Sequence, residues 1–197
     1  MRRARTPARV VEVPAGSAAA SALPEFDNGE TVVAVGLCGA LRRLKAGEIA
    51  VYGRVVDATN TFAPDPPLVD VLAGALSGAV VVTACTADRV VTTMAARAVL
   101  AQRFDADVVD MEGSHLAAAL VARGVRFAMV RVVSDDASRD LPPIGDAIDP
   151  TGRIQPWALA LAFARAPQSA FAFIRNARRA LATLTETARA IALISSH

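Results

Sequence analysis

Residues 106–135 read ADVVDMEGSHLAAALVARGVRFAMVRVVSD. The stretch contains a short β-branched run, a helix-like segment from Glu112 that ends on Gly124, and a second apolar run from Arg126. Glycine just past the last helical position is a common helix stop, because it adopts the left-handed conformation without steric cost. The stretch therefore predicts a strand, a helix and a second strand in succession.

The same alternation extends over the rest of the chain. Other β-branched runs lie at residues 8–13, 31–37, 48–57 and 79–85, and other helix-like segments at 67–76 and 92–104. The runs are apolar on both faces, which is typical of strands covered by helices on both sides. The sequence predicts an α/β fold of one domain over residues 1–197, a three-layer αβα sandwich around a parallel or mixed sheet. A helical tail follows at about residues 154–194, interrupted at Pro167.

The composition argues against several classes of protein. The net charge is +2, with acidic and basic residues mixed along the chain, so we expect no nucleic-acid partner. The longest charge-free stretch, residues 71–87, falls short of a membrane span, so we expect no transmembrane helix. Neither Cys38 nor Cys85 has the spacing of a zinc site, and no secretory signal is evident at the N-terminus. We therefore expect a reduced, cytoplasmic protein without a metal.

Polar clusters follow four of the predicted strands. They are Cys38-Gly39 and the clusters at residues 86–88, 110–112 and 134–136. Ligands of α/β proteins collect at the carboxyl ends of strands. We therefore expect these four clusters to converge on one pocket.

Glu112 and Asp135 each allow a structural and a chemical interpretation. Glu112 stands where a strand gives way to a helix, and the helix dipole there favours a carboxylate by about 0.3–1 kcal/mol. A cap explains this residue without any ligand. Asp135 ends an apolar run near a donor such as Arg131, which suits a general acid. Ser134, Asp135 and Asp136 are also good N-caps for a following turn.

Other candidate residues have mainly structural interpretations. His115 has no second histidine nearby, and we expect it on a helix surface or in packing. Cys38 as a nucleophile would need a base, and His115 is the available histidine. The turn GLCGAL, residues 36–41, is either a ligand-facing glycine loop or a plain strand-to-loop turn. Residues 139–156, punctuated by proline and glycine, are either an active-site flap or a connector.

Three motifs, in order, resemble those of the purine nucleoside phosphorylase and methylthioadenosine/S-adenosylhomocysteine nucleosidase superfamily. GLCGALRRLKAGEIAVYGRVVDAT, residues 36–59, has the family's glycine-rich turn and its later Gly-Asp turn, here Gly47-Glu48. VDMEG, residues 109–113, is similar to the family's VEMEG motif, and RVVSD, residues 131–135, to its RxxSD motif. The resemblance covers about residues 31–137 and implies a mixed sheet of the nucleoside phosphorylase type.

The resemblance also implies roles for individual residues. Asp135 would protonate or hydrogen-bond the purine at N7, aided by Ser134. Glu112 would bind the ribose hydroxyls, with Met111 packed under the sugar and Asp110 close by. Glycosidic cleavage builds positive charge on the ribosyl ring and negative charge on the departing base, so both carboxylates would act in the transition state.

The resemblance places four more residues around the substrate. Val90 and Val91 would line the base, and Cys38 and Gly39 would face the nucleophile, either water or phosphate. The implied reaction is cleavage of the N-ribosyl bond of an adenosine-type nucleoside by hydrolysis or phosphorolysis. The reaction needs no cofactor, although phosphate is a possible co-substrate. Because relatives assemble as oligomers, the resemblance also implies a homo-oligomer.

The C-terminal third is similar to the hopanoid-associated phosphorylase branch of this superfamily. SDDASRDLPP, residues 134–143, and the segment DPTGRIQPWALALAFARAPQSAFAFIRNARRAL, residues 149–181, carry that similarity. It implies an adenosine joined to a polycyclic lipid as the substrate. The mixture of aromatic and arginine residues in the tail would also suit a peripheral lipid-associated module, although such tails more often pack on their own domain or a sister subunit.

The N-terminal region departs from the family pattern. Members usually begin with a further strand and helix carrying a glutamate that orients the attacking water, and phosphorylases add arginines for phosphate. Here Glu12 is the only acid in the predicted first strand, and Arg9 and the opening arginines are untested substitutes. We expect an N-terminally abbreviated enzyme, or one completed by a partner subunit, or a degenerate relative that binds nucleosides or regulates without turnover.

Overall fold

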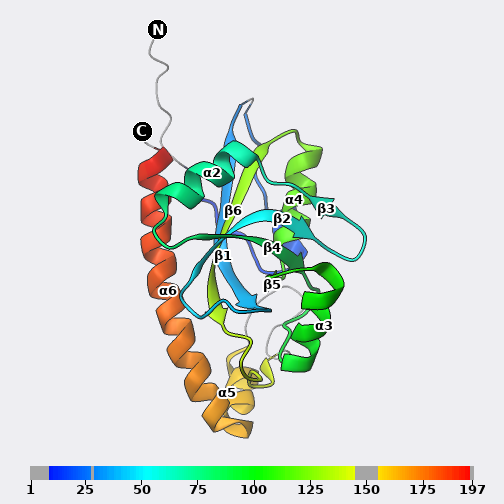
Figure 1. Cartoon of the computed structure of the whole chain (residues 1–197), viewed down its shortest axis with the longest axis vertical. Coiled ribbons are helices and arrows are strands. Elements are labelled where there is room, and N and C mark those ends of the chain that lie inside the picture. The colour runs from blue at the N-terminus through cyan, green and yellow to red at the C-terminus, as the bar shows by residue number, and fades with distance from the viewer. Residues whose placement is uncertain (1–8, 28, 145–154, 196–197) are drawn as a thin grey trace.

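Five strands pair into a closed ring and a sixth short strand extends it, in a computed structural model that describes residues 9–27, 29–144 and 155–195 (Figure 1). The strand order is β3-β2-β4-β5-β1-β6, and β6 also pairs with β2. The strands are β1 (Thr31–Ala40), β2 (Ile49–Val56), β3 (Thr61–Phe62), β4 (Val80–Thr86), β5 (Val108–Asp110) and β6 (Arg126–Asp135). The helices are α1 (Ala18–Ser21), α2 (Pro66–Ala75), α3 (Met94–Phe104), α4 (Gly113–Ala122), α5 (Pro156–Arg165) and α6 (Pro167–Ser195).

The sheet is mixed, which confirms the predicted fold class. β1 and β6 run parallel, from the pair Thr31 and Arg126 to the pair Gly39 and Asp135. β4 runs parallel to both β2 and β5, whereas β5 is antiparallel to β1 and β2 is antiparallel to β6. Because β5 runs antiparallel to β1, the four polar clusters do not share one edge of the sheet, contrary to the reasoning from which we expected them to converge on one pocket. They are neighbours because the short β5 pairs with the last residues of β1.

Helices cover the sheet on both faces. α2 and α6 contribute Leu72 and Ile191 to a core cluster with Val51 and Val130 of the sheet. α4 contributes Leu120 to a separate cluster on other sheet residues. Figure 1 shows α6 along one side of the molecule and α4 behind the strands. This layering is the predicted arrangement of sheet and helices.

Local sequence determines where the helices near the site begin. The Asp65 side chain accepts a hydrogen bond from Leu68 N at 3.1 Å at the start of α2, where Pro66 takes the first helical position. Thr93 caps α3 in the same way, and the Asp140 carboxylate accepts from Met94 N at 2.7 Å. Asp140 therefore joins the start of α3 to the segment that follows β6.

The predicted strand at residues 8–13 is wrong over the part that the structure describes. Residues 9–13 are not in any strand, and Val10 is 88% exposed. β-Branched residues favour a strand only where a neighbouring strand edge is available, and this segment pairs with none. The predicted helical tail with an interruption at Pro167 is confirmed. α5 ends at Arg165, and α6 begins at Pro167 after the single residue Ala166.

Some predicted features fall outside the described residues. These are the opening arginines, residues 145–154 of the proline- and glycine-rich stretch, and His197. Among the described helices, none combines the length and apolarity that a membrane crossing requires.

Candidate active site

Asp135, the last residue of β6, lies in a buried ion pair with Arg97 of α3. The Arg97 guanidinium donates to Asp135 Oδ2, and the Ser134 hydroxyl lies 2.6 Å from Asp135 Oδ1. The side chain of Arg97 is 2% exposed and that of Asp135 is 10% exposed. Asp135 is therefore a fixed carboxylate that keeps a small accessible surface, which is a suitable state for a group that meets a ligand.

Arg97 also binds backbone carbonyl oxygens from three segments. It donates to Val91 O at 3.1 Å, to Ala40 O at 3.3 Å and to Asp136 O at 2.8 Å. These bonds join the loop before α3 to the ends of β1 and β6. The sequence analysis missed Arg97. The sequence feature that could have indicated its burial is its spacing of four residues from Ala101, which puts both on the buried face of α3.

Gly39 allows the Asp135 carboxylate to approach β1. A Cβ atom at residue 39 would lie 2.9 Å from Asp135 Oδ2 and 3.5 Å from Val109 Cγ1. The β1–β6 pairing shifts between Cys38 and Gly39, so that Gly39 pairs with Asp135 as well as with Val109 of β5. The Ser134 hydroxyl is also 3.1 Å from Cys38 O. The glycine turn of the sequence motif thus contacts Asp135 directly.

Asp110 has a scaffolding position. Its Oδ2 accepts from Tyr52 OH at 3.1 Å, and its Oδ1 accepts from Thr86 Oγ1 and Gly113 N, both at 3.0 Å. Arg131 Nε lies 3.7 Å from Oδ2, and the Asp110 side chain is 0% exposed. Asp110 therefore caps the start of α4 and compensates the buried Arg131. Arg131, which we expected near Asp135, lies beside Asp110 instead.

Buried charges shift the pKa values of the groups around Arg131. Burial and the neighbouring Asp110 raise the pKa of Tyr52 well above its usual value. Burial alone would lower the pKa of Arg131, but Tyr52, Asp110 and Glu112 raise it. The guanidinium also lies over the Tyr52 ring, 5.8 Å from its centroid. Arg131 thus stays charged between β1 and Asp110, where it donates to Ala34 O at 2.9 Å.

Glu112 begins α4, but its side chain does not cap that helix. Its Oε1 accepts from Gly16 N at 3.0 Å, a bond to the segment just before α1. Burial raises the pKa of Glu112, and the Gly16 N–H opposes that rise. Met111 beside it is half-buried. Glu112 thus occupies the predicted N-cap position of α4 without a side-chain capping hydrogen bond, and its carboxylate is available for another contact.

The remaining predicted site residues lie around this centre. Val90 and Val91 are half-buried in the loop between β4 and α3, and Val91 packs on a core cluster that includes Cys85 and Val109. Burial and the nearby Asp110 raise the pKa of the Cys38 thiol, which is 4% exposed. A buried, protonated thiol is a poor nucleophile. Half-buried His115 lies on α4, as we expected of a packing residue.

The structure brings Asp135, Ser134, Cys38 and Gly39 together, and it places Glu112, Met111 and Asp110 on the other side of β1. Among the described residues, Glu112 and Asp135 share no hydrogen-bond partner. No cluster of three metal-ligating side chains occurs within the same residues. Glu12 is exposed, and Arg9 donates to Glu25 O at 3.1 Å, so neither takes part in the candidate site.

Solved structures of nucleosidases share this fold. The 5′-methylthioadenosine/S-adenosylhomocysteine nucleosidase of Helicobacter pylori aligns with a TM-score of 0.55 and 17% identity, over 81% of this chain and 68% of that one. The Campylobacter jejuni enzyme of the same name gives 0.52 and 19%, over 67% of each chain. A putative methylthioadenosine nucleosidase of Weissella paramesenteroides gives 0.52 and 22%, over 55% of this chain and 59% of that one. The present chain thus spans roughly three-fifths to two-thirds of their length.

Sequence comparison gives the family. No curated protein matches the chain significantly. Residues 12–152 match the sequence profile of the Phosphorylase superfamily, a range that includes β1 to β6 and every candidate site residue. Since the profile covers most of the chain and the sheet has the matching architecture, the chain belongs to the Phosphorylase superfamily.

Proposed function

We propose that the protein cleaves the N-ribosyl bond of an adenosine-type purine nucleoside, by hydrolysis or phosphorolysis. The observation that carries the proposal is the state of Asp135. It is a carboxylate at the end of β6, held by Arg97 and Ser134 against Gly39 and still partly accessible. The family supports this reading, and one Helicobacter pylori relative has been solved with 5′-methylthioadenosine in its active site.

In this proposal Asp135 is the acid of the reaction. The N9–C1′ bond breaks with its electron pair moving to the purine, and C1′ bonds to an oxygen of water or phosphate, which gives up one proton. The purine becomes a neutral base once one proton reaches N7. Asp135 would deliver or share that proton, with Ser134 orienting its Oδ1 atom. Arg97 would act as a positioning residue, because it touches Asp135 and three carbonyl groups and not the substrate.

Glu112 is the proposed ribose ligand. A carboxylate accepts hydrogen bonds from both ribose hydroxyls and strengthens them as positive charge develops on the sugar. The backbone N–H of Gly16 occupies one of its oxygens, which leaves the other for the sugar. Met111 would pack under the ribose, and Val90 and Val91 would line the base. Asp110 would contribute indirectly, by fixing the start of α4 through Gly113 N.

The finer assignments are part of the proposal. We infer that the ribose carries a hopanoid group, from the similarity of residues 134–143 and 149–181 to that branch. No cofactor is required, phosphate is a candidate co-substrate, and we propose a cytoplasmic homo-oligomer. The rival proposal is a nucleoside-binding protein without turnover. The observation in its favour is that the structure gives Glu12 no place in the site.

The experiment is adenine release from adenosine and 5′-methylthioadenosine, with and without phosphate, followed by chromatography. Free adenine without phosphate identifies a hydrolase, and phosphate dependence identifies a phosphorylase. Asp135→Asn should lower kcat/KM by about 10²–10⁴-fold, the range for loss of a general acid. Asp70→Asn is the matched control, because Asp70 is exposed on α2. Nucleoside binding without adenine release would support the rival, and full activity of Asp135→Asn would refute the assigned acid.

A further inference from the structure

A cavity of about 590 Å³ lies between α6 and the loop that joins β1 to β2. The loop contributes residues 42–46, α6 contributes Arg175, Asn176 and Arg179, and the segment after β6 contributes residues 136–138. Neither Asp135 nor Glu112 lines it. The volume lies within the usual range for small-molecule sites. The cavity is therefore a candidate site distinct from the one described above.

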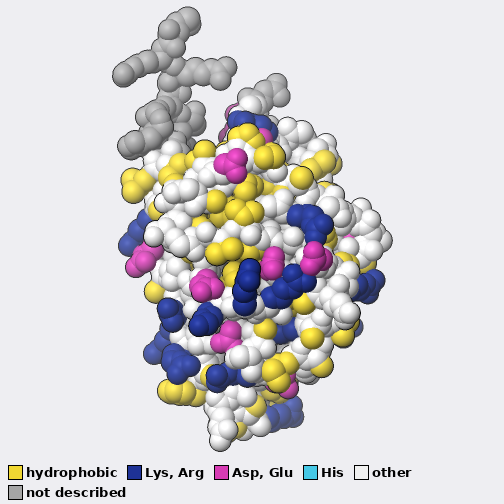
Figure 2. All heavy atoms as spheres, in the orientation of Figure 1, with side chains coloured by type: hydrophobic (Ala, Val, Ile, Leu, Met, Phe, Trp, Pro, Cys, Tyr) yellow, Lys and Arg dark blue, Asp and Glu magenta, His cyan; other side chains and the backbone are white. Residues whose placement is uncertain are grey.

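The lining of this cavity is strongly basic. Five of its described residues are cationic, namely Arg42, Arg43, Lys45, Arg175 and Arg179, and Asp136 is the one acid among them. Figure 2 shows basic side chains gathered over the lower half of one face of the molecule. The chain as a whole has a net charge of only +2, so this concentration of charge is local.

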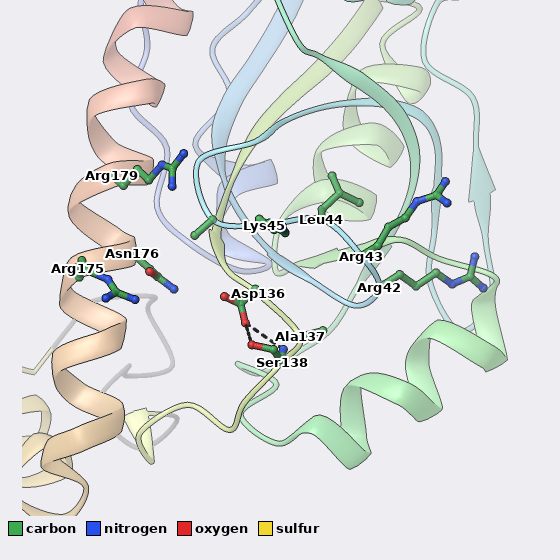
Figure 3. Close-up of a pocket in the computed structure, with 11 residues that line it drawn as sticks. Arg42, Arg43, Leu44, Lys45, Asp136, Ala137, Ser138, Arg175, Asn176 and Arg179 are labelled. Carbon is green, nitrogen blue, oxygen red and sulfur yellow. Dashed lines mark hydrogen bonds between the residues drawn. The ribbon is translucent and has the colours of Figure 1, made fainter.

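Four of the five cations form no ion pair with any described residue. Arg42 is paired with Asp105 at 2.7 Å, and Figure 3 shows Arg42 and Arg43 extending away from α6. Besides Arg43, the cations without an ion pair in the described part of the chain are Lys45, Arg175 and Arg179. These side chains are exposed, so water screens part of their mutual repulsion, and a bound anion would remove the rest.

Arg179 lies close to Gly47 of the loop. Gly47 has φ +92°, and a Cβ atom there would lie 2.9 Å from Arg179 Nε. The arginine thus lies directly against the loop, in a contact that uses none of its N–H donors for an ion pair. Arg175 lies one helical turn earlier on α6, and Figure 3 shows Asn176 and both arginines on the side of α6 that faces the loop.

Asp136 does not neutralise this cluster. Its Oδ1 accepts from Ser138 N at 3.0 Å and from the Ser138 hydroxyl. Burial alone would raise the pKa of Asp136, but the Ser138 bonds and the nearby Arg139 and Arg97 lower it, so it remains charged. Because the Asp136 carboxylate is turned toward Ser138, the wall of the cavity that α6 contributes keeps an excess of positive charge.

We propose that this cavity binds a phosphate group, with Lys45, Arg175 and Arg179 as its charged ligands and the Asn176 amide as a neutral donor. Guanidinium groups match phosphate oxygens with paired N–H donors, and an ammonium adds a point charge. The cations surround a hollow and do not form an extended stripe, so a small phosphate compound is the ligand and not a nucleic acid. The site does not depend on the proposed nucleoside cleavage, because it uses other side chains.

Isothermal titration calorimetry of the full chain tests this proposal, in buffer free of phosphate and sulfate. The probes are inorganic phosphate, adenosine 5′-monophosphate and adenosine. The test variant is Arg175→Gln/Arg179→Gln, and the control is Arg178→Gln/Arg189→Gln, which removes the same charge from exposed residues of the same helix outside the cavity. The test variant should bind phosphate at least tenfold more weakly, the control should change less than twofold, and Asp136→Asn should bind more tightly.

The outcomes separate two sources of the phosphate group. Binding of inorganic phosphate that the test variant loses supports the site with the free ion as ligand. Binding of adenosine 5′-monophosphate that the test variant loses, where inorganic phosphate fails to bind, supports the site with a phosphate ester as ligand. The proposal is overturned if the wild-type chain binds the monophosphate no better than adenosine and does not bind inorganic phosphate. Equal losses in the test and control variants also overturn it.

Discussion

Replacement of Arg97 by methionine tests the central ion pair of the candidate site. The change keeps much of the side-chain volume but removes the donors to Asp135 and to three backbone carbonyl groups. Asp135, whose side chain is 10% exposed, would then keep Ser134 as its only side-chain partner among the described residues. Breaking one half of a buried pair costs about 3–5 kcal/mol. For a chain of this size that loss lowers Tm by about 6–20 °C.

The companion variants make the test specific. Asp135→Asn should cost less, about 1.5–3 kcal/mol, because Arg97 keeps its three carbonyl acceptors. The double variant Arg97→Met/Asp135→Asn should lose less stability than the sum of the two single variants, by about 1–3 kcal/mol. Arg103→Met is the control, because Arg103 is exposed on the same helix and its guanidinium lies over the Phe104 ring.

The assay is urea unfolding followed by circular dichroism, with adenine release measured well below each Tm. A loss under about 1 kcal/mol for Arg97→Met, together with strict additivity in the double variant, would show that the pair does not hold Asp135.

Three further changes test the scaffold. Gly113→Ala should strongly lower Tm in thermal melts, because its Cβ would lie 2.8 Å and 2.9 Å from the Asp110 oxygens. Gly74→Ala is the control, since the space around Gly74 is open, and it should raise the free energy of unfolding by about 0.5–1 kcal/mol. Equal effects of the two changes would contradict the packing around Gly113. Burial raises the pKa of Glu112, so the folded state binds its proton more tightly than the unfolded state, and stability from this group falls as the pH rises through the folded pKa. Glu112→Gln should therefore raise Tm relative to the wild type at pH 7 but not at pH 4, and a constant difference would refute this. Since burial raises the pKa of Cys38, iodoacetamide at pH 8 should alkylate it only on unfolding, and mass spectrometry of the folded protein would detect any exception.

Regular elements with a local signal could be predicted from the sequence. The apolar runs at residues 31–37 and 126–134 lie in β1 and β6, and the helix that ends before Gly124 is α4. Each pattern is set by residues a few positions apart, which a sequence shows directly. The strand predicted at residues 8–13 failed because a strand also needs a partner, and residues 9–13 pair with none of the described strands.

The partners of the site residues could not be predicted, because they lie far away in the chain. Arg97 meets Asp135 across 38 positions, and Gly16 meets Glu112 across 96. Arg131 was the nearer donor to Asp135 in sequence, and strict alternation over four positions would place both side chains on one face of β6. The register shift of the β1–β6 pairing between Cys38 and Gly39 breaks that alternation, and Arg131 lies beside Asp110 instead. The sequence was sufficient to identify Asp110 and Asp135 as candidate site residues. Which arginine pairs with each of them depends on the three-dimensional arrangement of the strands and α3.

The two buried arginine–aspartate pairs, Arg97–Asp135 and Arg131–Asp110, have different roles. Both arginines donate to β1 carbonyl groups, Arg97 to Ala40 and Arg131 to Ala34. A buried ion pair rarely stabilises a fold more than apolar packing would, so its retention needs another explanation. The side chain of Asp110 is 0% exposed, and its carboxylate also accepts from Tyr52, Thr86 and Gly113, which is a scaffold. Asp135 keeps an exposed fraction, and among the described residues its further side-chain hydrogen bond is with Ser134. Of the two carboxylates, Asp135 is therefore the one that retains accessible surface for a ligand.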